Sequence, residues 1–563
     1  MLQGGVLNLS LLMSVSFLFF CSCFSLAQQV THRQIPFELV GVNTAKEKEI
    51  TLEEVVEMAL RNNRGIEVER INTELSQFGV KSAQGQYDPN FSFGPSFRSL
   101  TIPVGSVLGG GPNGAVSDDY YAFSTSLRQL LPAGGNFAVS FDNQRQTTNN
   151  IFTSLNPQYG TSLSLNFAQP LFRNLKMDSA RHQIRIAKKQ ISLSDAQFRF
   201  KVMEIVTAVV QSYWNLAYTY NDLEVKRETA QWALDQLESN KRLAAAGTLP
   251  QVQIVESEAE LQRREGDVLV AMQDINRAQN ILKQLILPDR EDSLWKESLK
   301  PKYKIDWKPY FMELPVALQK ALAARPELEQ INLQQEINAI DVAYNQSQAK
   351  PQLDLLASYL STGLAGAFFD QPNFFTAQSQ LVLGRLNELS NLAGLPPVQP
   401  IPQGSLPANL VGGYGSSLNN LFLQRYRTAQ VGITLSLPLR NRTAEANLAS
   451  SLATGRQIRT LRQQMEQVVE ADVRNSLQAV LTAQKRVETA AAERQASQAQ
   501  LESEQRRFRA GETINFFVLT RQNQLSEARS RELRALADYI IAKAQFQRAT
   551  ATILDEYSIQ LGK

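Results

Sequence analysis

The side chains that most often carry out chemistry are scarce in this chain of 563 residues. Its two histidines, His32 and His182, stand far apart in the sequence, and we expect each to be a surface residue rather than a base or a metal ligand. No glycine-rich phosphate loop, nucleophile elbow or paired His/Cys spacing occurs in the sequence. The sequence therefore predicts no catalytic residues, no cofactor, no metal site and no use of ATP.

Both cysteines, Cys21 and Cys23, lie in an N-terminal segment that is predicted to be a signal peptide. Residues 1–27 contain no charged side chain, have an apolar run at positions 6–20, and end in the small-x-small pattern of a signal peptidase site. The run is too short to span a bilayer. Lipid attachment at Cys23 is the alternative, although the residues before it match a lipobox poorly. Cleavage after Ala27 would leave an exported chain without cysteine, and so without disulfides or thiol chemistry.

The charge balance argues against a nucleic-acid partner. The chain has 57 Lys and Arg against 54 Asp and Glu, which gives a formal net charge of +3. The two signs are interspersed along the segments predicted to be helical, so we interpret these charges as solvated helix faces.

The chain repeats one order of segments, in which a β-rich stretch precedes a very long helical stretch. The sequence at 52–66 aligns without gaps on that at 314–328. Further matches follow in the same order, pairing 86–93 with 348–355, 167–174 with 435–442, and 242–261 with a segment that ends at Leu525. A period of roughly 265 residues is too long for a solenoid and indicates duplication of a whole structural unit. We predict two structural repeats, at 28–287 and 314–563, joined by a connector at 288–313.

Each repeat is predicted to contain a long helical hairpin, at 174–287 and at 443–560. Apolar residues recur every seven positions in both, at Val202, Val209, Leu216, Leu223, Ala230 and Leu237, and at Val473, Val480, Val487, Leu501 and Phe508. With a rise of about 1.5 Å per residue, each first helix reaches on the order of 100 Å. Gly247 and Gly511 are expected to close these helices before a second helix returns. We expect the two hairpin turns to form an exposed docking end.

The segments at about 89–172 and 352–438 alternate apolar and polar residues, as membrane-spanning strands do. Alternation is clearest at Phe91, Phe93, Pro95 and Phe97, at Leu163, Leu165 and Phe167, and at Val431, Ile433 and Leu435. A soluble antiparallel sandwich is the alternative. The export signal, aromatic residues near strand ends and long polar connections at 103–119 and 363–420 favour an outer-membrane barrel. Four strands cannot close a barrel, and open sheet edges are forbidden in lipid, so several chains must contribute to one barrel. Residues 122–142 either add two strands or belong to an external loop.

The whole predicted mature chain resembles the TolC-like outer-membrane efflux protein family. The resemblance rests on Ala-Arg-Pro-Glu-Leu at 324–328, on the strand ending Gln-Pro-Leu-Phe at 169–172, and on the glycine-centred turns at Gly247 and Gly511. It implies a mainly α fold with membrane β, namely a trimeric transmembrane β-barrel, with four strands per subunit, continuous with a long periplasmic α-helical barrel. A mixed belt around the middle would involve residues 40–80 and 288–345.

The resemblance also implies where partners bind and where the duct is narrow. In this family a periplasmic adaptor, linked to an inner-membrane pump, docks on the tip turns. Carried over, those residues are Gly247, Thr248, Leu249, Gly511, Glu512 and Thr513. Similar proteins often place an acidic residue six positions after each tip glycine, where this chain has Gln253 and Phe517; nine positions on it has Glu256 and Thr520. A ring of Phe517 would make an apolar constriction rather than a charged one.

Three functions remain open at this point. The first is a passive outer-membrane duct that exports small toxic compounds, with energy supplied by partners. The second is a duct for type I protein secretion, which the sequence does not distinguish from the first. The third is a non-conducting envelope protein whose coiled helices space the membranes.

Overall fold

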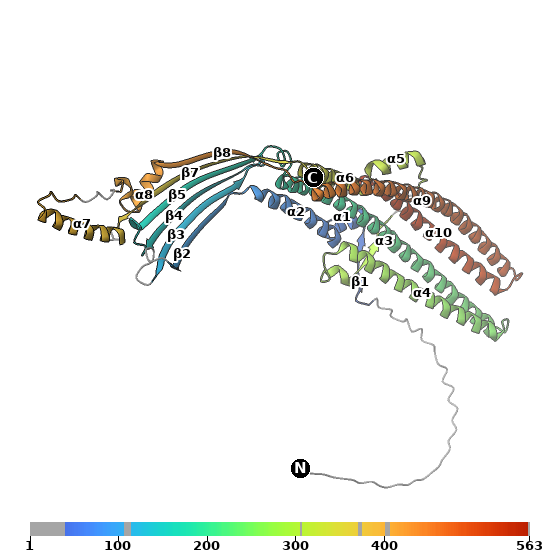
Figure 1. The fold of residues 1–563 in the computed structure, drawn as a ribbon. Helices are drawn as coiled ribbons and strands as arrows, with labels where there is room; N and C mark the ends of the chain where they lie inside the picture. Colours follow the sequence, from blue (N-terminus) through green and yellow to red (C-terminus); the bar gives the residue numbers. More distant parts are fainter. Residues whose placement is uncertain (1–39, 106–113, 304–306, 370–373, 400–405, 561–563) are drawn as a thin grey trace, which may run out of the picture.

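The computed structural model describes residues 40–105, 114–303, 307–369, 374–399 and 406–560. Within them the molecule is elongated, with a sheet at one end, two long helical hairpins at the other and a small mixed layer between (Figure 1). The predicted signal peptide, both cysteines and His32 lie outside the described residues. No helix in the described ranges is both long enough and apolar enough to cross a membrane.

One antiparallel sheet holds strands of both predicted repeats, in the order β2-β3-β4-β5-β7-β8. Their bounds are Asn90–Pro103 for β2, Ala115–Leu130 for β3, Asn136–Thr148 for β4, Leu155–Pro170 for β5, Gln352–Phe368 for β7 and Tyr426–Ser436 for β8. The two repeats meet where β5 pairs with β7. The shortest strand has 11 residues and the longest 17, and a tilted strand needs about 9–11 to cross a bilayer.

The sheet has six strands, so the four per subunit implied by the family resemblance are too few. The additional strands, β3 and β4, contain the hairpin at 122–142 and lie between β2 and β5. They continue the alternation, because the register puts Phe123 and Phe141 on the same face as Phe93. Their connecting turn is tight, with the Leu131 amide donating to the Gly135 carbonyl at 2.7 Å. Both strands are therefore part of the sheet and not an external loop.

The register separates an apolar face of the sheet from a polar one. The apolar face carries Phe91, Phe93, Phe97, Val139, Phe141, Leu163, Leu165, Phe167, Tyr359, Val431, Ile433 and Leu435. On the polar face, serine hydroxyls of neighbouring strands are hydrogen-bonded, at 2.7 Å between Ser92 and Ser126 and 2.6 Å between Ser140 and Ser164. One side is thus mainly apolar, as a face in hydrocarbon would be. The separation is not complete, because Arg145 lies on the apolar face, and Leu356 and Leu360 of β7 lie on the polar face.

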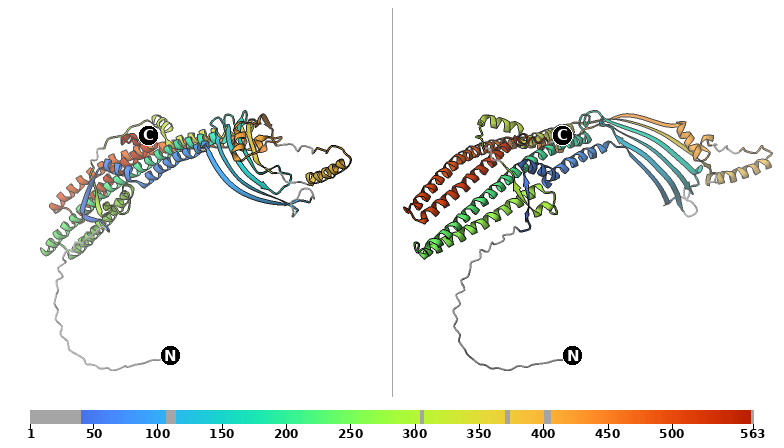
Figure 2. Two further views of the ribbon diagram at one scale, coloured as in Figure 1. Left: turned by 90° about the vertical axis from the view of Figure 1, so that its left-hand side faces the viewer. Right: turned by 180° about the vertical axis from the view of Figure 1, so that it is seen from behind.

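The helices form one layer four helices wide. Beside the sheet, neighbours follow the order α2, α3, α6, α9, and toward the far end the order α4, α3, α10, α9 (Figures 1 and 2). Their bounds are Arg64–Gln84 for α2, Ser179–Ala245 for α3, Gln251–Ile286 for α4, Pro326–Gln348 for α6, Arg442–Arg509 for α9 and Asn515–Ala549 for α10. Most of the predicted heptad positions are buried in both repeats, including Val209 and Val480 with no exposed surface, and the other two, Ala230 and Phe508, are half-buried. α3 and α9 run through both parts of the layer and make it continuous.

A small mixed layer surrounds the middle of the long helices. It consists of the parallel strands β1 (Asn43–Ile50) and β6 (Glu297–Pro301), with α1 (Leu52–Asn62), α5 (Leu314–Ala324) and α11 (Ile553–Glu556). A capping box at Thr51 and Glu54 begins α1. The Tyr213 hydroxyl on α3 donates to the carbonyls of Ile50 and Lys302, at 3.3 and 2.9 Å, which ties this layer to the central helix.

The connection at 363–420, expected to be an irregular polar loop, is more ordered than the sequence indicated. β7 continues into it as far as Phe368, and two helices follow, α7 (Phe374–Leu392) and α8 (Tyr414–Phe422). The remaining elements are short 3-10 helices, at Gly85–Tyr87, Ser293–Lys296 and Ala408–Leu410.

His182 is not the surface residue that we expected. Its side chain is 17% exposed, and its Nε2 lies 2.7 Å from an Asp341 carboxylate oxygen on α6. Its ring stacks on Tyr344, with centroids 4.3 Å apart. His182 therefore joins two helices of the layer.

Candidate functional site

The two hairpin tips share one backbone geometry. At the first, Gly247 has φ of 76°, and the amides of Gly247 and Thr248 donate to the carbonyls of Ala244 and Leu243, each at 3.0 Å. At the second, Gly511 has φ of 74°, and the amides of Gly511 and Glu512 donate to Phe508 and Arg507, also at 3.0 Å. This Schellman pattern satisfies the last carbonyls of a helix and needs a left-handed residue, which glycine adopts without steric cost.

The side chains at the tips differ although the backbones match. Gly247, Thr248, Gly511 and Glu512 are exposed, whereas Leu249 and Thr513 are half-buried. The last turn of α9 carries several arginines, and Arg507 lies 3.8 Å from the Glu512 carboxylate. The structure thus presents four of the six predicted docking residues to solvent, on two turns of different charge.

The residues predicted to line a constriction lie on the returning helices, just beyond the tips. Phe517 is 49% exposed and meets the neighbouring Phe516 edge to face, with centroids 5.6 Å apart. Glu256 is exposed, and Gln253 and Thr520 are half-buried. Because α3 lies between α4 and α10, a single subunit does not bring the first-repeat pair next to the second-repeat pair.

Polar contacts that the sequence did not indicate join the two hairpins across α3 and α10. The Ser530 hydroxyl lies 2.6 Å from an Asp222 carboxylate oxygen. Arg529 pairs with Glu228 at 2.5 Å and also lies over the Trp232 ring, 5.6 Å from its centroid. The partners are about 300 positions apart, and neither belongs to a motif, so only the fold reveals them. They join the two hairpins of one subunit roughly 25–40 Å from the tip turns.

A buried polar cluster anchors the first hairpin to the mixed layer. Lys283 on α4 has no exposed surface, and its ammonium donates to the carbonyls of Trp295 and Glu297 at 3.0 and 2.7 Å. Burial lowers the pKa of Lys283, and burial raises the pKa of Tyr213 well above its usual range. Gln279 donates to the Tyr220 hydroxyl at 2.8 Å beside it. These contacts fix the hairpin at its base while its tip stays exposed.

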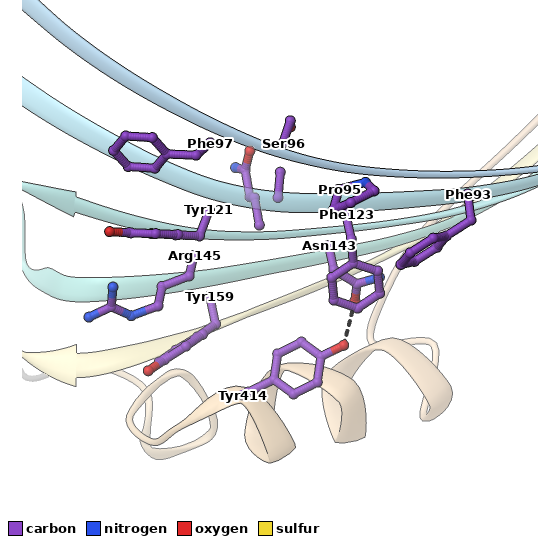
Figure 3. A pocket seen from close by; sticks show the side chains of 12 residues that line it. Phe93, Pro95, Ser96, Phe97, Tyr121, Phe123, Asn143, Arg145, Tyr159 and Tyr414 are labelled. Atoms are coloured by element: carbon purple, nitrogen blue, oxygen red, sulfur yellow. Dashed lines mark hydrogen bonds between the residues drawn. The ribbon is translucent and has the colours of Figure 1, made fainter.

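At the opposite end, α8 covers part of the apolar face of the sheet. The Tyr414 hydroxyl donates to Asn143 Oδ1 at 2.7 Å, and its ring meets Tyr159 edge to face (Figure 3). With Phe97 and Tyr121 these side chains line an open hollow of about 630 Å³. No group of three or more His, Cys, Asp or Glu side chains in the described ranges is placed to hold a metal ion. The hollow is aromatic and carries no arrangement suited to catalysis.

Comparison with known proteins agrees with this geometry. The model of the family described as outer membrane efflux protein matches residues 136–286 and 402–552, one match in each predicted repeat. No curated protein sequence matches the chain. Among solved structures, the CmeC outer membrane channel of Campylobacter jejuni is 14% identical, with a TM-score of 0.59 over 89% of this chain and 86% of that one.

Two further outer membrane proteins are similar to about the same extent. The outer membrane protein VceC of Vibrio cholerae is 14% identical, with a TM-score of 0.56 over 89% of this chain and 95% of that chain. The open state of the MtrE outer membrane channel of Neisseria gonorrhoeae is 15% identical, with a TM-score of 0.55 over 89% of each chain. The predicted fold class, mainly helical with strands and internally duplicated, is confirmed.

Proposed function

This chain belongs to the outer membrane efflux protein family, and from that premise we propose that it is the passive exit duct of a tripartite export system. Membership makes it an outer-membrane channel with a periplasmic extension and not an enzyme. The proposal adds that three copies form the duct, that a periplasmic adaptor joins it to an inner-membrane pump, and that small toxic compounds are its cargo.

One observation carries the proposal. Both hairpins end in the same turn at one end of the molecule, and the sheet with its apolar face lies at the other end (Figure 1). α3 alone has 67 residues and spans on the order of 100 Å. A subunit of this shape would form one lengthwise segment of the channel wall, long enough to reach from the outer membrane deep into the periplasm.

Within this proposal each part of the chain has a role. Residues 1–27 direct export, and the repeats at 28–287 and 314–563 each supply strands and one hairpin. The adaptor docks at Gly247, Thr248, Leu249, Gly511, Glu512 and Thr513. The narrowest part of the duct is lined by Gln253, Glu256, Phe517 and Thr520, where the exposed Phe517 ring favours an apolar closure.

Photo-cross-linking in cells tests the docking assignment. A probe at Thr513, or at Thr248, is expected to capture an adaptor, whereas a probe at Thr482 is not. Thr482 is the matched control because it is an exposed threonine on α9, roughly 40 Å from the tip. Capture at Thr482 alone, or at none of the three, would refute docking at the tips.

The identity of the captured assembly decides the cargo class. Capture of an adaptor bound to a proton-driven pump would support efflux of small compounds. Capture of an adaptor bound to an ATP-driven exporter would instead support type I protein secretion. The purified protein is also expected to conduct ions in planar bilayers as a trimer. An elongated trimer that never conducts would instead support the structural, non-conducting alternative.

A further inference from the structure

The sheet of one subunit has two open edges. β2 and β8 are its outermost strands, and each pairs with a single strand among the described residues. Almost every residue of both is exposed. Unpaired backbone N–H and C=O groups are very unfavourable in hydrocarbon, so a sheet whose edges lie in a membrane must be closed. The edges therefore require a partner strand from outside the subunit.

The two edges suit one another. β2 runs away from the helices and β8 runs toward them, so β2 of one copy would lie antiparallel to β8 of the next. Their faces agree as well, since Phe93 and Ile433 belong to the apolar face while Ser92 and Thr434 belong to the polar one. The same pairing would therefore continue both faces around a ring.

The outermost helices, α2 and α9, continue the contact proposed between β2 of one copy and β8 of the next, which we call the seam. α2 leads into β2, and β8 leads into α9, so each strand edge continues as a helix edge. α2 exposes four large apolar side chains at heptad spacing, Val68, Ile71, Leu75 and Phe78. At the other edge α9 exposes Leu452, Leu461 and Val468. Matching apolar surfaces on both edges indicate that the occupant is a second copy of this chain.

The width of the layer matches six strands rather than four. Four helices spaced about 9 Å apart cover an arc of about 36 Å. Six strands spaced about 4.8 Å and tilted by about 40° cover about 38 Å, whereas four would cover about 25 Å. With β3 and β4 in the wall, the helical layer passes into the sheet without narrowing.

We propose that β2 of each copy pairs antiparallel with β8 of the next, and that the complete barrel has eighteen strands, six from each of three copies. This rests on the proposed trimer. The backbone diameter would be about 36 Å, compared with about 24 Å for twelve strands. Barrels of this strand number leave an open aqueous channel. The β3–β4 hairpin is the part of the chain that widens the exit.

Disulfide cross-linking tests the wall strand by strand, because the predicted mature chain has no cysteine of its own. All variants share Ser92→Cys on β2. Adding Ser126→Cys on β3 is expected to give a link within one chain, since the two hydroxyls are 2.7 Å apart. Adding Ser164→Cys on β5 is expected to give none, because three strand spacings of about 4.8 Å exceed the reach of a disulfide.

The seam itself is tested by combining Ser92→Cys with Thr434→Cys, and with Gly432→Cys and Ser436→Cys as neighbours in register. One of these pairs is expected to link different chains into a ladder that ends at three subunits. An intrachain link between positions 92 and 164 would overturn the proposal, because β2 would then adjoin β5 and β3–β4 would lie outside the wall. So would the lack of any link between β2 and β8 in a protein whose mass is that of a trimer.

The trimer is measured separately, by the mass of the cysteine-free protein in detergent. A mass other than three subunits would refute the proposed trimer while leaving the links within one chain unchanged. A trimer that shows twelve strands by electron microscopy would refute only the eighteen-stranded barrel.

Discussion

Replacing the tip glycine Gly511 by alanine is expected to loosen the second hairpin turn. The residue has φ of 74°, and a Cβ at this position would meet no atom within 4 Å, so the cost is conformational and not steric. A left-handed conformation costs a residue with a Cβ roughly 1–2 kcal/mol. Alanine also lowers the conformational entropy of the unfolded chain, which stabilises the folded turn by about 0.4–1 kcal/mol. The net loss is therefore about 1 kcal/mol per tip, or about a fivefold change in the opening equilibrium.

Hydrogen exchange at the tip measures this loss directly. The amides of Gly511 and Glu512 donate to the last carbonyls of α9, so the Glu512 amide is expected to exchange about five times faster in Gly511→Ala. Gly511→Asn should lie between the two, because asparagine tolerates the left-handed conformation better than alanine. Gly247→Ala should behave like Gly511→Ala, since Gly247 has φ of 76° and open space around it.

Gly266 provides the matched control. It lies inside α4, and a Cβ there would also meet no atom within 4 Å, but its backbone is helical. Alanine is better than glycine in a helix interior by up to about 1 kcal/mol, so Gly266→Ala is expected to slow local exchange. If Gly511→Ala slowed exchange as Gly266→Ala does, the tip glycine would not be held in the left-handed conformation and the reasoning would fail.

Three other predictions concern the duct and its base. Phe517→Asp is expected to increase cation preference and open-channel conductance in planar bilayers, and unchanged values would refute an apolar constriction at this exposed ring. Ser530→Ala removes the contact with Asp222 and should raise conductance because α3 and α10 separate more easily; equal conductance would mean that this contact does not restrain the tips. Tyr557 directly follows α11 in the mixed layer, and burial raises its pKa from 10 to about 12, so the stabilising contribution of the neutral side chain is complete below pH 10 and is lost as the pH rises through 12. Tyr557→Phe should therefore flatten the fall in melting temperature over that range, which corresponds to up to about 3 kcal/mol, and an identical fall would refute the assignment.

The helical part of the fold was predictable because its signal is long and periodic. Positions such as Val202, Val209 and Val480 recur every seven residues and are fully buried. The roles of the tip glycines were predictable because the end of a helix at glycine depends on the backbone preference of that residue and not on contacts with distant parts of the chain. Both signals depend only on residues within one or two turns of one another.

The contacts that cross the molecule were not predictable. Ser530 and Asp222 lie about 300 positions apart, and the pairing of His182 with Asp341 is equally remote from any motif. The strands of the hairpin at 122–142 showed the right alternation, but alternation does not reveal which strands are neighbours. Only the register, which puts β3 and β4 between β2 and β5, decides that they belong to the sheet.

Duplication makes the two tips alike in backbone and unlike in side chains, and this difference bears on how an adaptor could recognise them. The turns at Gly247 and Gly511 have φ values within a few degrees and the same hydrogen bonds. A partner that bound only the backbone of this turn would occupy all six tips of the proposed trimer equally. The exposed Glu512, however, has no counterpart in the sequence Thr-Leu-Pro that follows Gly247. The last turn of α9 carries three arginines, Arg506, Arg507 and Arg509, whereas the last turn of α3 carries Arg242 alone. An adaptor that senses charge would therefore distinguish alternate tips around the ring, and unequal capture by probes at Thr248 and Thr513 would identify side chains, not the shared backbone, as what it recognises.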